Sequence, residues 1–277
     1  MKKIRNLAHS NPVAFCLLLA GFTTVCSLAS AKFFTFFPWT LTTYFTSTVV
    51  GILWPLALTL ILGYGYIFRM GSFGATLVPG LPCLLLRLSL MTIYITQFFT
   101  GETPWVSLPV MLTGVLYLFG IGFWEEMIFR GIIGNTLARK YATDTKGMWF
   151  SVILSAAIFS VIHLQSLAYG VSPKAMAAQL TGAFGMGLVL AAIYLRGGNL
   201  WFLVLLHTIV DVPGSFQSTF IISNGTGDVI DNIGKLDLNS ILGLLPVHIA
   251  LTIFLLRKSK QPAIFARLEK LRSEISC

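Results

Sequence analysis

Apolar runs long enough to cross a membrane recur along this chain. A membrane-spanning helix needs about 20 mainly apolar residues. Segments of about this length cover residues 12–31, 46–68, 77–99, 107–130, 148–168, 177–195, 199–221 and 240–256. The longest polar connection between them, residues 223–238, has the composition of a loop. The pattern therefore predicts an all-α fold, a polytopic integral membrane helical bundle with about eight transmembrane helices.

Composition agrees with the membrane class and argues against a nucleic-acid partner. Hydrophobic residues make up 56% of the chain and charged residues only 10%, against about 25% charged in ordinary soluble domains. The net charge is +9, but the basic residues form short clusters next to the apolar segments and do not line one soluble face. They are better interpreted as topology signals than as a nucleic-acid surface.

The distribution of lysine and arginine tests this helix count, because these residues prefer cytoplasmic loops. If the N-terminus is cytoplasmic, all Lys and Arg residues outside the apolar segments fall on the inner side, except Lys32, Lys174 and Lys235. Arg87 and Arg130 lie within apolar segments. We expect both termini to lie in the cytoplasm and the protein to reside in a bacterial cell membrane. Arg87 is expected to pair with a carboxylate or carbonyl inside the bundle.

The chain is expected to form one transmembrane domain over residues 1–260, followed by a basic cytoplasmic tail over residues 261–277. The apolar residues of the tail have near-helical spacing, so it is either an amphipathic helix on the inner membrane surface or a solvated tail. The first apolar segment also has the pattern of a cleavable signal peptide. Its removal would leave the orientation of the remaining helices unchanged.

The first polar feature inside the apolar segments is a pair of glutamates followed by an arginine. Charged residues in a membrane helix cost roughly 2.5–3.5 kcal/mol each on insertion scales, so they indicate a structural or functional role. Glu126 and Arg130 are four residues apart and share a helix face, which favours an ion pair. Glu125 is directed about 100° away from its neighbour, given 3.6 residues per turn.

The second and third polar features are histidines in later segments. His163 lies in the fifth segment, and His207 lies four residues before Asp211 in the seventh, so these two side chains can meet. Each histidine alone is compatible with helix packing. Because the lipid side is closed to charged groups, however, all these residues are expected to face the interior and form one polar pocket with Glu125.

Such a pocket contains the groups that amide hydrolysis requires. A glutamate or histidine can take a proton from water and return it to a leaving amine, while histidine or arginine can stabilise an oxyanion. No GxSxG, HExxH or HxxEH motif is present. Zinc remains an alternative, since two histidines and one carboxylate are a common catalytic set; the ligands would be Glu125, His163 and His207.

These residues, taken in order, resemble the CPBP family of intramembrane peptidases, the CAAX-protease and bacteriocin-processing (Abi) group related to Rce1. The EExxxR pattern corresponds to Glu125, Glu126 and Arg130, the FxxxH pattern to Phe159 and His163, and the final histidine motif to His207 and Asp211. The resemblance covers about residues 105–215. It implies an intramembrane endopeptidase acting on a membrane-associated or lipid-anchored peptide or protein.

The resemblance also implies roles for the individual residues. Glu125 would activate water with the help of His163, and His207 with Asp211 would bind or polarise the scissile carbonyl. Glu126 and Arg130 would support the site. Many relatives have asparagine where this chain has Asp211; because an ionised carboxylate cannot donate a hydrogen bond to an oxyanion, Asp211 is expected to orient His207 instead. The family is described both as metalloproteases and as metal-free, and we favour the scheme that requires no cofactor.

Two other classes of function use the same residues. A non-catalytic immunity or scaffold protein could keep the fold and bind a partner. An ion-coupled transporter could use the cluster as a proton relay, but the inverted repeats and broken helices expected of many transporters are not evident in the sequence. The intact set of acids and histidines favours the peptidase.

Overall fold

The computed structural model describes residues 2–34, 36, 41–100, 105–221 and 236–275, and it is helical throughout these ranges apart from short connections. The one β-type pairing among them is an isolated bridge between Trp105 and Ile221. Most of the predicted loop 223–238 lies outside the described residues. The helices are α1 Lys2–Ser10, α2 Pro12–Phe34, α3 Leu41–Ile61, α4 Phe73–Thr100, α5 Leu108–Glu126, α6 Asn135–Tyr141, α7 Thr145–Val161, α8 Pro173–Gly197, α9 Leu200–Phe220, α11 Leu238–Leu255 and α12 Gln261–Ile275.

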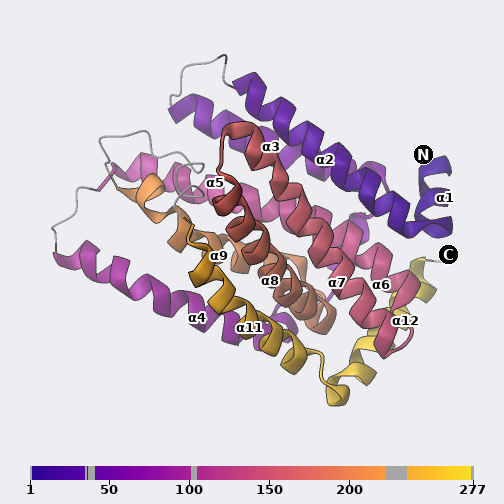
Figure 1. The fold of residues 1–277 in the computed structure, drawn as a ribbon. Helices are drawn as coiled ribbons and strands as arrows, with labels where there is room; N and C mark the ends of the chain where they lie inside the picture. The colour runs from indigo at the N-terminus through magenta and orange to yellow at the C-terminus, as the bar shows by residue number, and fades with distance from the viewer. Residues whose placement is uncertain (1, 35, 37–40, 101–104, 222–235, 276–277) are drawn as a thin grey trace.

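The fold is an all-α membrane bundle, as the sequence predicts. Each predicted segment coincides with a helix (Figure 1). Within the described residues, five helices are long and apolar enough to cross a membrane, and three more are apolar over shorter stretches, Phe45–Ile61, Phe73–Ser89 and Leu200–Phe216. Many large apolar side chains remain exposed on the outside of the bundle, for example Leu18, Val78 and Leu112. Exposed apolar surface of this extent fits a lipid environment.

Several boundaries differ from the predicted ones for local reasons. The second predicted segment ends early, because α3 stops at Ile61 and a 3₁₀ turn, η1 Gly65–Arg69, follows. The fourth continues beyond Arg130 through a π-helix, η2 Met127–Gly134, into α6. The fifth and sixth begin earlier than apolarity alone indicates, since Asp144 and Ser172 cap α7 and α8 by accepting backbone N–H bonds.

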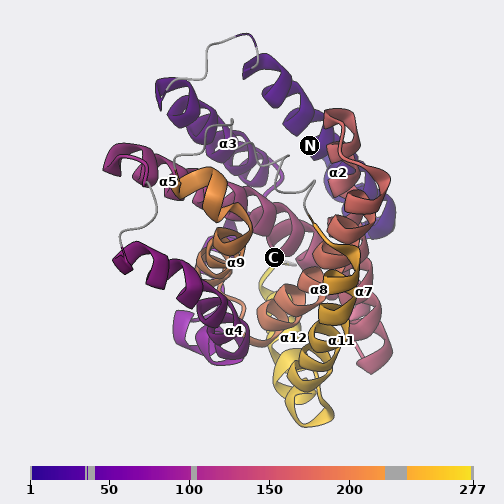
Figure 2. The ribbon, with the colours of Figure 1, turned by 60° about the vertical axis from the view of Figure 1, so that its left-hand side comes forward.

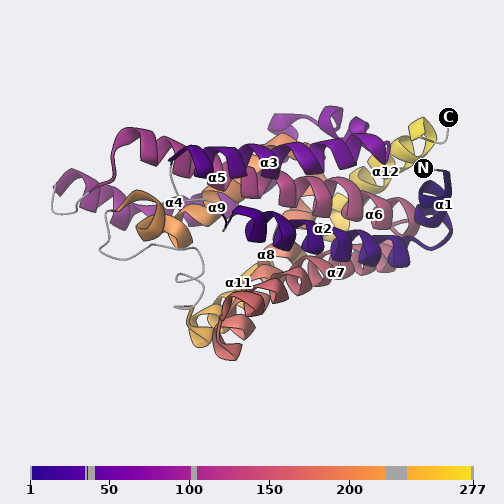
Figure 3. The ribbon, with the colours of Figure 1, turned by 90° about the horizontal axis from the view of Figure 1, so that it is seen from above.

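The two termini lie at the same end of the bundle (Figures 1 and 3). The tail helix α12 packs there, with Ile264 and Leu268 in the core. Arg272 donates hydrogen bonds to the carbonyls of Ala138 and Ala142. The tail is thus helical over Gln261–Ile275, and its apolar residues pack against the protein; the predicted contact with the membrane surface stays a prediction.

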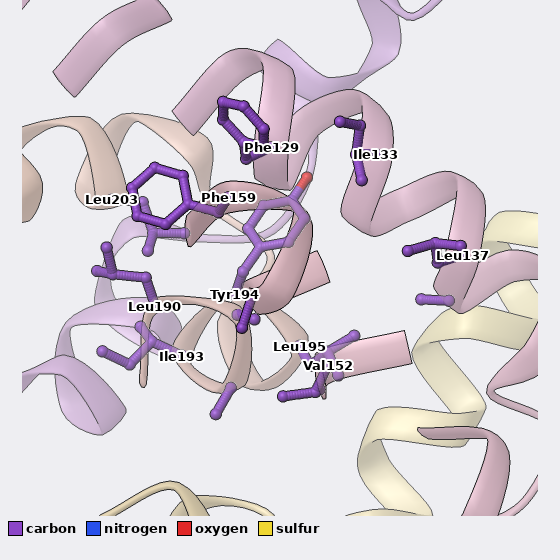
Figure 4. Close-up of a cluster of buried hydrophobic side chains, with 14 of the residues drawn as sticks. Phe129, Ile133, Leu137, Val152, Phe159, Leu190, Ile193, Tyr194, Leu195 and Leu203 are labelled. Carbon is purple, nitrogen blue, oxygen red and sulfur yellow. The ribbon is translucent and has the colours of Figure 1, made fainter. Parts of the chain in front are cut away.

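Helix α8 lies in the interior of the bundle and organises its core. It packs against α7 and α11, while α9 packs against α5 and α4 (Figure 2). Apolar side chains from η2, α6, α7, α8 and α9 meet in the cluster drawn in Figure 4, which includes Phe129, Phe159, Tyr194 and Leu203. The α5–α9 contact is close because α5 has a glycine there. A Cβ at Gly122 would lie 3.0 Å from the Val204 carbonyl oxygen.

We expect Gly122→Val to destabilise the protein. The added atoms would push α9 away from α5, and overpacking of this kind costs about 1–3 kcal/mol. Gly21→Val in α2 is the matched control, because a Cβ there meets nothing within 4 Å. Thermal unfolding in detergent should show a lower midpoint for Gly122→Val than for Gly21→Val. Equal midpoints would contradict the close α5–α9 contact.

Candidate active site

The two glutamates lie at the end of α5, where the helix changes to the wider π form. Insertions of this type often occur at functional sites. Glu126 Oε1 accepts a hydrogen bond from Arg130 Nη1 at 2.8 Å, and both side chains are almost completely buried. The α5–η2 segment therefore positions an anion and a cation in the bundle interior, where neither is exposed to lipid.

His207 of α9 connects the two glutamates. Its Nδ1 lies 2.6 Å from Glu126 Oε1, and its Nε2 lies 3.3 Å from Glu125 Oε2. Although Glu125 and Glu126 leave the helix in different directions, both reach the same imidazole because the ring lies between them. The two carboxylates differ in exposure: 9% of the Glu125 side chain is accessible, against 0% for Glu126.

Each of these contacts requires one proton between the imidazole nitrogen and the carboxylate oxygen. A nitrogen without a proton has a lone pair, and an ionised carboxylate only accepts hydrogen bonds. The Nδ1 contact with Glu126 therefore needs one shared proton, and the Nε2 contact with Glu125 needs a second. If both glutamates are ionised, His207 is an imidazolium whose Nδ1–H donates to Glu126 and whose Nε2 lies within ion-pair distance of Glu125.

Asp211 lies one helical turn after His207, at the accessible edge of the cluster. Its Oδ2 is 3.7 Å from His207 Nε2, and 27% of the Asp211 side chain is exposed. That separation is longer than a hydrogen bond, although the charges still attract each other. Asp211 thus adds negative charge beside His207 without holding the ring in place, which Glu126 does at much shorter range.

Phe159 of α7 brings His163 next to this network. Arg130 lies over its ring, 4.3 Å from the centroid, a favourable cation–π contact. The rings of His163 and His207 pack edge to face against it, with centroids 5.0 and 6.1 Å away. His163, at the start of the 3₁₀ helix η3 Ile162–Tyr169, makes a 2.8 Å hydrogen bond from Nδ1 to the Phe159 carbonyl.

The tautomer of neutral His163 follows from that bond. A carbonyl oxygen can only accept, so Nδ1 carries the proton and Nε2 has a free lone pair. The side chain is partly buried. His163 therefore offers an acceptor nitrogen, and its ring and that of His207 both pack against Phe159.

All six residues lie in the part of the chain that matches a known family. Residues 107–213 match the sequence model of the Rce1-like family, described as type II CAAX prenyl endopeptidase Rce1-like. The chain contains an Rce1-like region. It begins at Ser107, directly before α5, and ends in α9, and it confirms the predicted family resemblance.

The Rce1-like match covers less than half of the chain, from α5 to α9. The packing of α2, α3, α4 and α11 around it is therefore known from the structure alone. Searches of curated proteins and of solved structures returned no match.

The residues of the Rce1-like region do not fit a metal site as they are arranged. Among the described residues, no group of three or more His, Cys, Asp or Glu side chains is placed to hold a metal ion. Both nitrogens of His207 face carboxylates, and Nδ1 of His163 bonds a carbonyl. The alternative zinc set Glu125, His163 and His207 does not converge on one point.

Sequence reasoning missed two features of the Rce1-like region and its surroundings. Phe159 was a motif position without a role, and only the structure shows it in contact with Arg130 and both histidines. Arg87 in α4 was expected to pair inside the bundle. Its Nε is buried without a hydrogen-bond partner among the described residues, although its charge acts on Asp211.

We expect the buried pair Glu126 and Arg130 to be strongly coupled in stability. Arg130→Met alone should destabilise the protein by about 3–5 kcal/mol, because Glu126 is left as a buried charge with reduced compensation. The double variant with Glu126→Gln should lose less than the sum of the single changes.

The control is the pair Lys270 and Glu274, whose side chains are 77% and 59% exposed. Lys270→Met should change stability by no more than about 1 kcal/mol. Denaturant unfolding of the four variants measures both quantities. Additive effects at Glu126 and Arg130 would contradict the buried ion pair.

Proposed function

We propose that this protein is an intramembrane endopeptidase that hydrolyses a peptide bond in a membrane-associated or lipid-anchored substrate with water activated by Glu125. The observation that supports this most strongly is the position of Glu125. It is the carboxylate that combines contact with His207 and residual exposure, while Glu126 is enclosed. The Rce1-like match supports a protease of the CAAX type.

In this proposal Glu125 and His163 both bind the attacking water molecule, with Glu125 as the base and His163 as a hydrogen-bond acceptor. The Nε2 lone pair of His163 accepts one O–H of the water, and Glu125 takes the proton of the other. The remaining oxygen attacks the substrate carbonyl carbon and forms a tetrahedral intermediate with a negative oxygen. General-base catalysis of this kind contributes about 10²–10⁴-fold to rate.

His207 then changes partner within the same step. While Glu125 is ionised, it attracts the Nε2–H of His207 across a 3.3 Å separation of Nε2 and Oε2. Once Glu125 is protonated that contact weakens, and the N–H becomes available to the oxyanion. Glu125 subsequently gives its proton to the leaving amine as the C–N bond breaks. Glu126 and Arg130 keep the His207 ring oriented throughout, and in this scheme Asp211 adjusts the charge without binding the oxyanion.

The orientation in the membrane is also part of the proposal. Basic residues lie in or next to the connections between helices: Arg69 ends η1, Arg139 lies in α6, Lys146 in the first turn of α7, and Arg257 follows α11. Helices α6 and α12 lie at the end of the bundle that holds both termini (Figure 1). We infer that this end faces the cytoplasm of a bacterial cell, because basic residues accumulate in cytoplasmic loops.

Glu125→Gln should reduce peptide cleavage by about 10²-fold or more, since the amide cannot take a proton. Asp211→Asn should change the rate by less than about tenfold, because Asp211 lies beyond hydrogen-bond distance of His207. Detergent-purified protein would be offered a library of acylated peptides, with cleavage products identified by mass spectrometry. Glu274→Gln, at an exposed carboxylate, is the control and should behave as wild type. Loss of activity in Asp211→Asn with retention in Glu125→Gln would assign the base to Asp211.

Cleavage should also persist after treatment with a strong chelator, because the donor atoms of the cluster are already occupied by one another. Cleavage of the same peptides by the same purified protein would be measured before and after dialysis against the chelator. Loss of activity that added Zn²⁺ restores would overturn this part of the mechanism.

A further inference from the structure

A polar cavity lies at the end of the bundle that contains the termini, away from the candidate active site. Its volume is about 190 Å³, room for roughly six water molecules at about 30 Å³ each. Arg139 on its wall is thirteen residues after Glu126 along the α5–η2–α6 segment, which corresponds to a rise of roughly 20 Å. The cavity is thus not part of the peptidase cluster.

Five elements build the walls of this cavity. Helix α1 contributes His9, α2 contributes Phe15, the turn after α3 contributes Leu62 and Tyr64, η1 contributes Tyr66, and α6 contributes Arg139. Two hydrogen bonds fix them. Tyr64 Oη and Thr136 Oγ1 of α6 are 2.6 Å apart, and Lys140 Nζ donates to the His9 carbonyl at 3.4 Å.

Two polar groups on the wall have no partner in the described part of the chain. Arg139 Nε and Tyr66 Oη are buried without a partner in ordinary hydrogen-bond geometry, and the polar group that acts most strongly on the Tyr66 hydroxyl is the Arg139 side chain, by charge and by weak hydrogen bonding. The charge of Arg139 acts on Tyr66, so the two groups border the same space. Burial raises the pKa of the Tyr66 hydroxyl; the group stays protonated and can donate. Buried polar groups without partners are rare in native structures and indicate an unseen ligand, ion or water.

The charge around the cavity favours an anion. No Asp or Glu is among the described residues that line it, and none of the ion pairs in the described part of the chain includes Arg139. The main-chain carbonyl of Arg139 is already bonded by Arg272 of α12, which leaves the guanidinium as its free polar group.

We propose that this cavity binds a phosphate group, with Arg139 and Tyr66 as its donors. A planar guanidinium matches phosphate oxygens in a forked geometry, and a protonated tyrosine adds one more donor. The walls also include apolar Phe15 and Leu62, and basic pockets at the cytoplasmic ends of membrane helices bind lipid head groups. The phosphate belongs either to an anionic phospholipid or to a soluble phosphate compound. This proposal does not depend on the peptidase function.

The test is thermal unfolding of delipidated, detergent-purified full-length protein titrated with phosphatidylglycerol, with phosphatidylcholine, and with inorganic phosphate or glycerol 3-phosphate. The variants are Arg139→Gln, Arg139→Lys and Tyr66→Phe. The control is Lys146→Gln, an exposed cation at the start of α7 outside the cavity. Each shift is measured from the variant's own ligand-free midpoint, so a loss of basal stability does not obscure the result.

Phosphatidylglycerol should raise the midpoint of wild type and Lys146→Gln, and Arg139→Gln should weaken the apparent affinity about tenfold or more, because hydrogen bonds to charged groups contribute this much. Arg139→Lys and Tyr66→Phe should give intermediate losses. An equal response to the soluble phosphates would support the site and identify a soluble ligand. The proposal is overturned if no ligand shifts wild type, or if Arg139→Gln and Lys146→Gln respond alike.

Discussion

One buried imidazole held between two carboxylates is the contact on which the candidate site depends. His207 meets Glu126 through Nδ1 and Glu125 through Nε2, so its position fixes the relation between α9 and the end of α5. The contact needs the close α5–α9 approach at Gly122 and the π form of η2 that follows the glutamates. A change at either place would move Glu125 relative to His207 even if no site residue were altered.

The same contact explains how the bundle tolerates so many ionisable groups. Each charge taken into a membrane interior is expensive unless it is compensated. Here Arg130 forms an ion pair with Glu126 and lies over the Phe159 ring. Glu126 also contacts His207 Nδ1. The charge contacts are shortest at Glu126, where Arg130 and His207 both meet Oε1, although Glu126 Oε2 and two nitrogens of Arg130 are buried without a hydrogen-bond partner. The contacts are longest toward Asp211, where the cluster is most exposed. We relate that gradient to function: the enclosed end holds the geometry, and the accessible end is the side from which a substrate and water can enter.

The fold was largely predictable from sequence, whereas the pairing inside the site was predictable only in part. Long apolar segments locate helices because the period and length of the pattern are strong signals, but their ends depend on single capping residues such as Asp144 and Ser172. The Glu126–Arg130 pair is local in sequence and followed from spacing. The Glu126–His207 contact joins residues 81 positions apart, and no spacing rule specifies which nitrogen faces which carboxylate. The cavity at Arg139 was not foreseen, because it is assembled from five separate elements.

With both glutamates ionised, both nitrogens of His207 carry protons: Nδ1–H donates to Glu126, and Nε2 lies within ion-pair distance of Glu125. The most direct measurement is ¹⁵N NMR of the histidine side chains in protein labelled at its four histidines, with His207 assigned by comparison with His163→Asn and His248→Asn. Near neutral pH we expect both His207 nitrogens to have the ¹⁵N chemical shifts of a protonated imidazolium. Glu126→Gln should change the chemical shift of Nδ1. A neutral His207 ring with one unprotonated nitrogen, unchanged by Glu126→Gln, would contradict this assignment of protons.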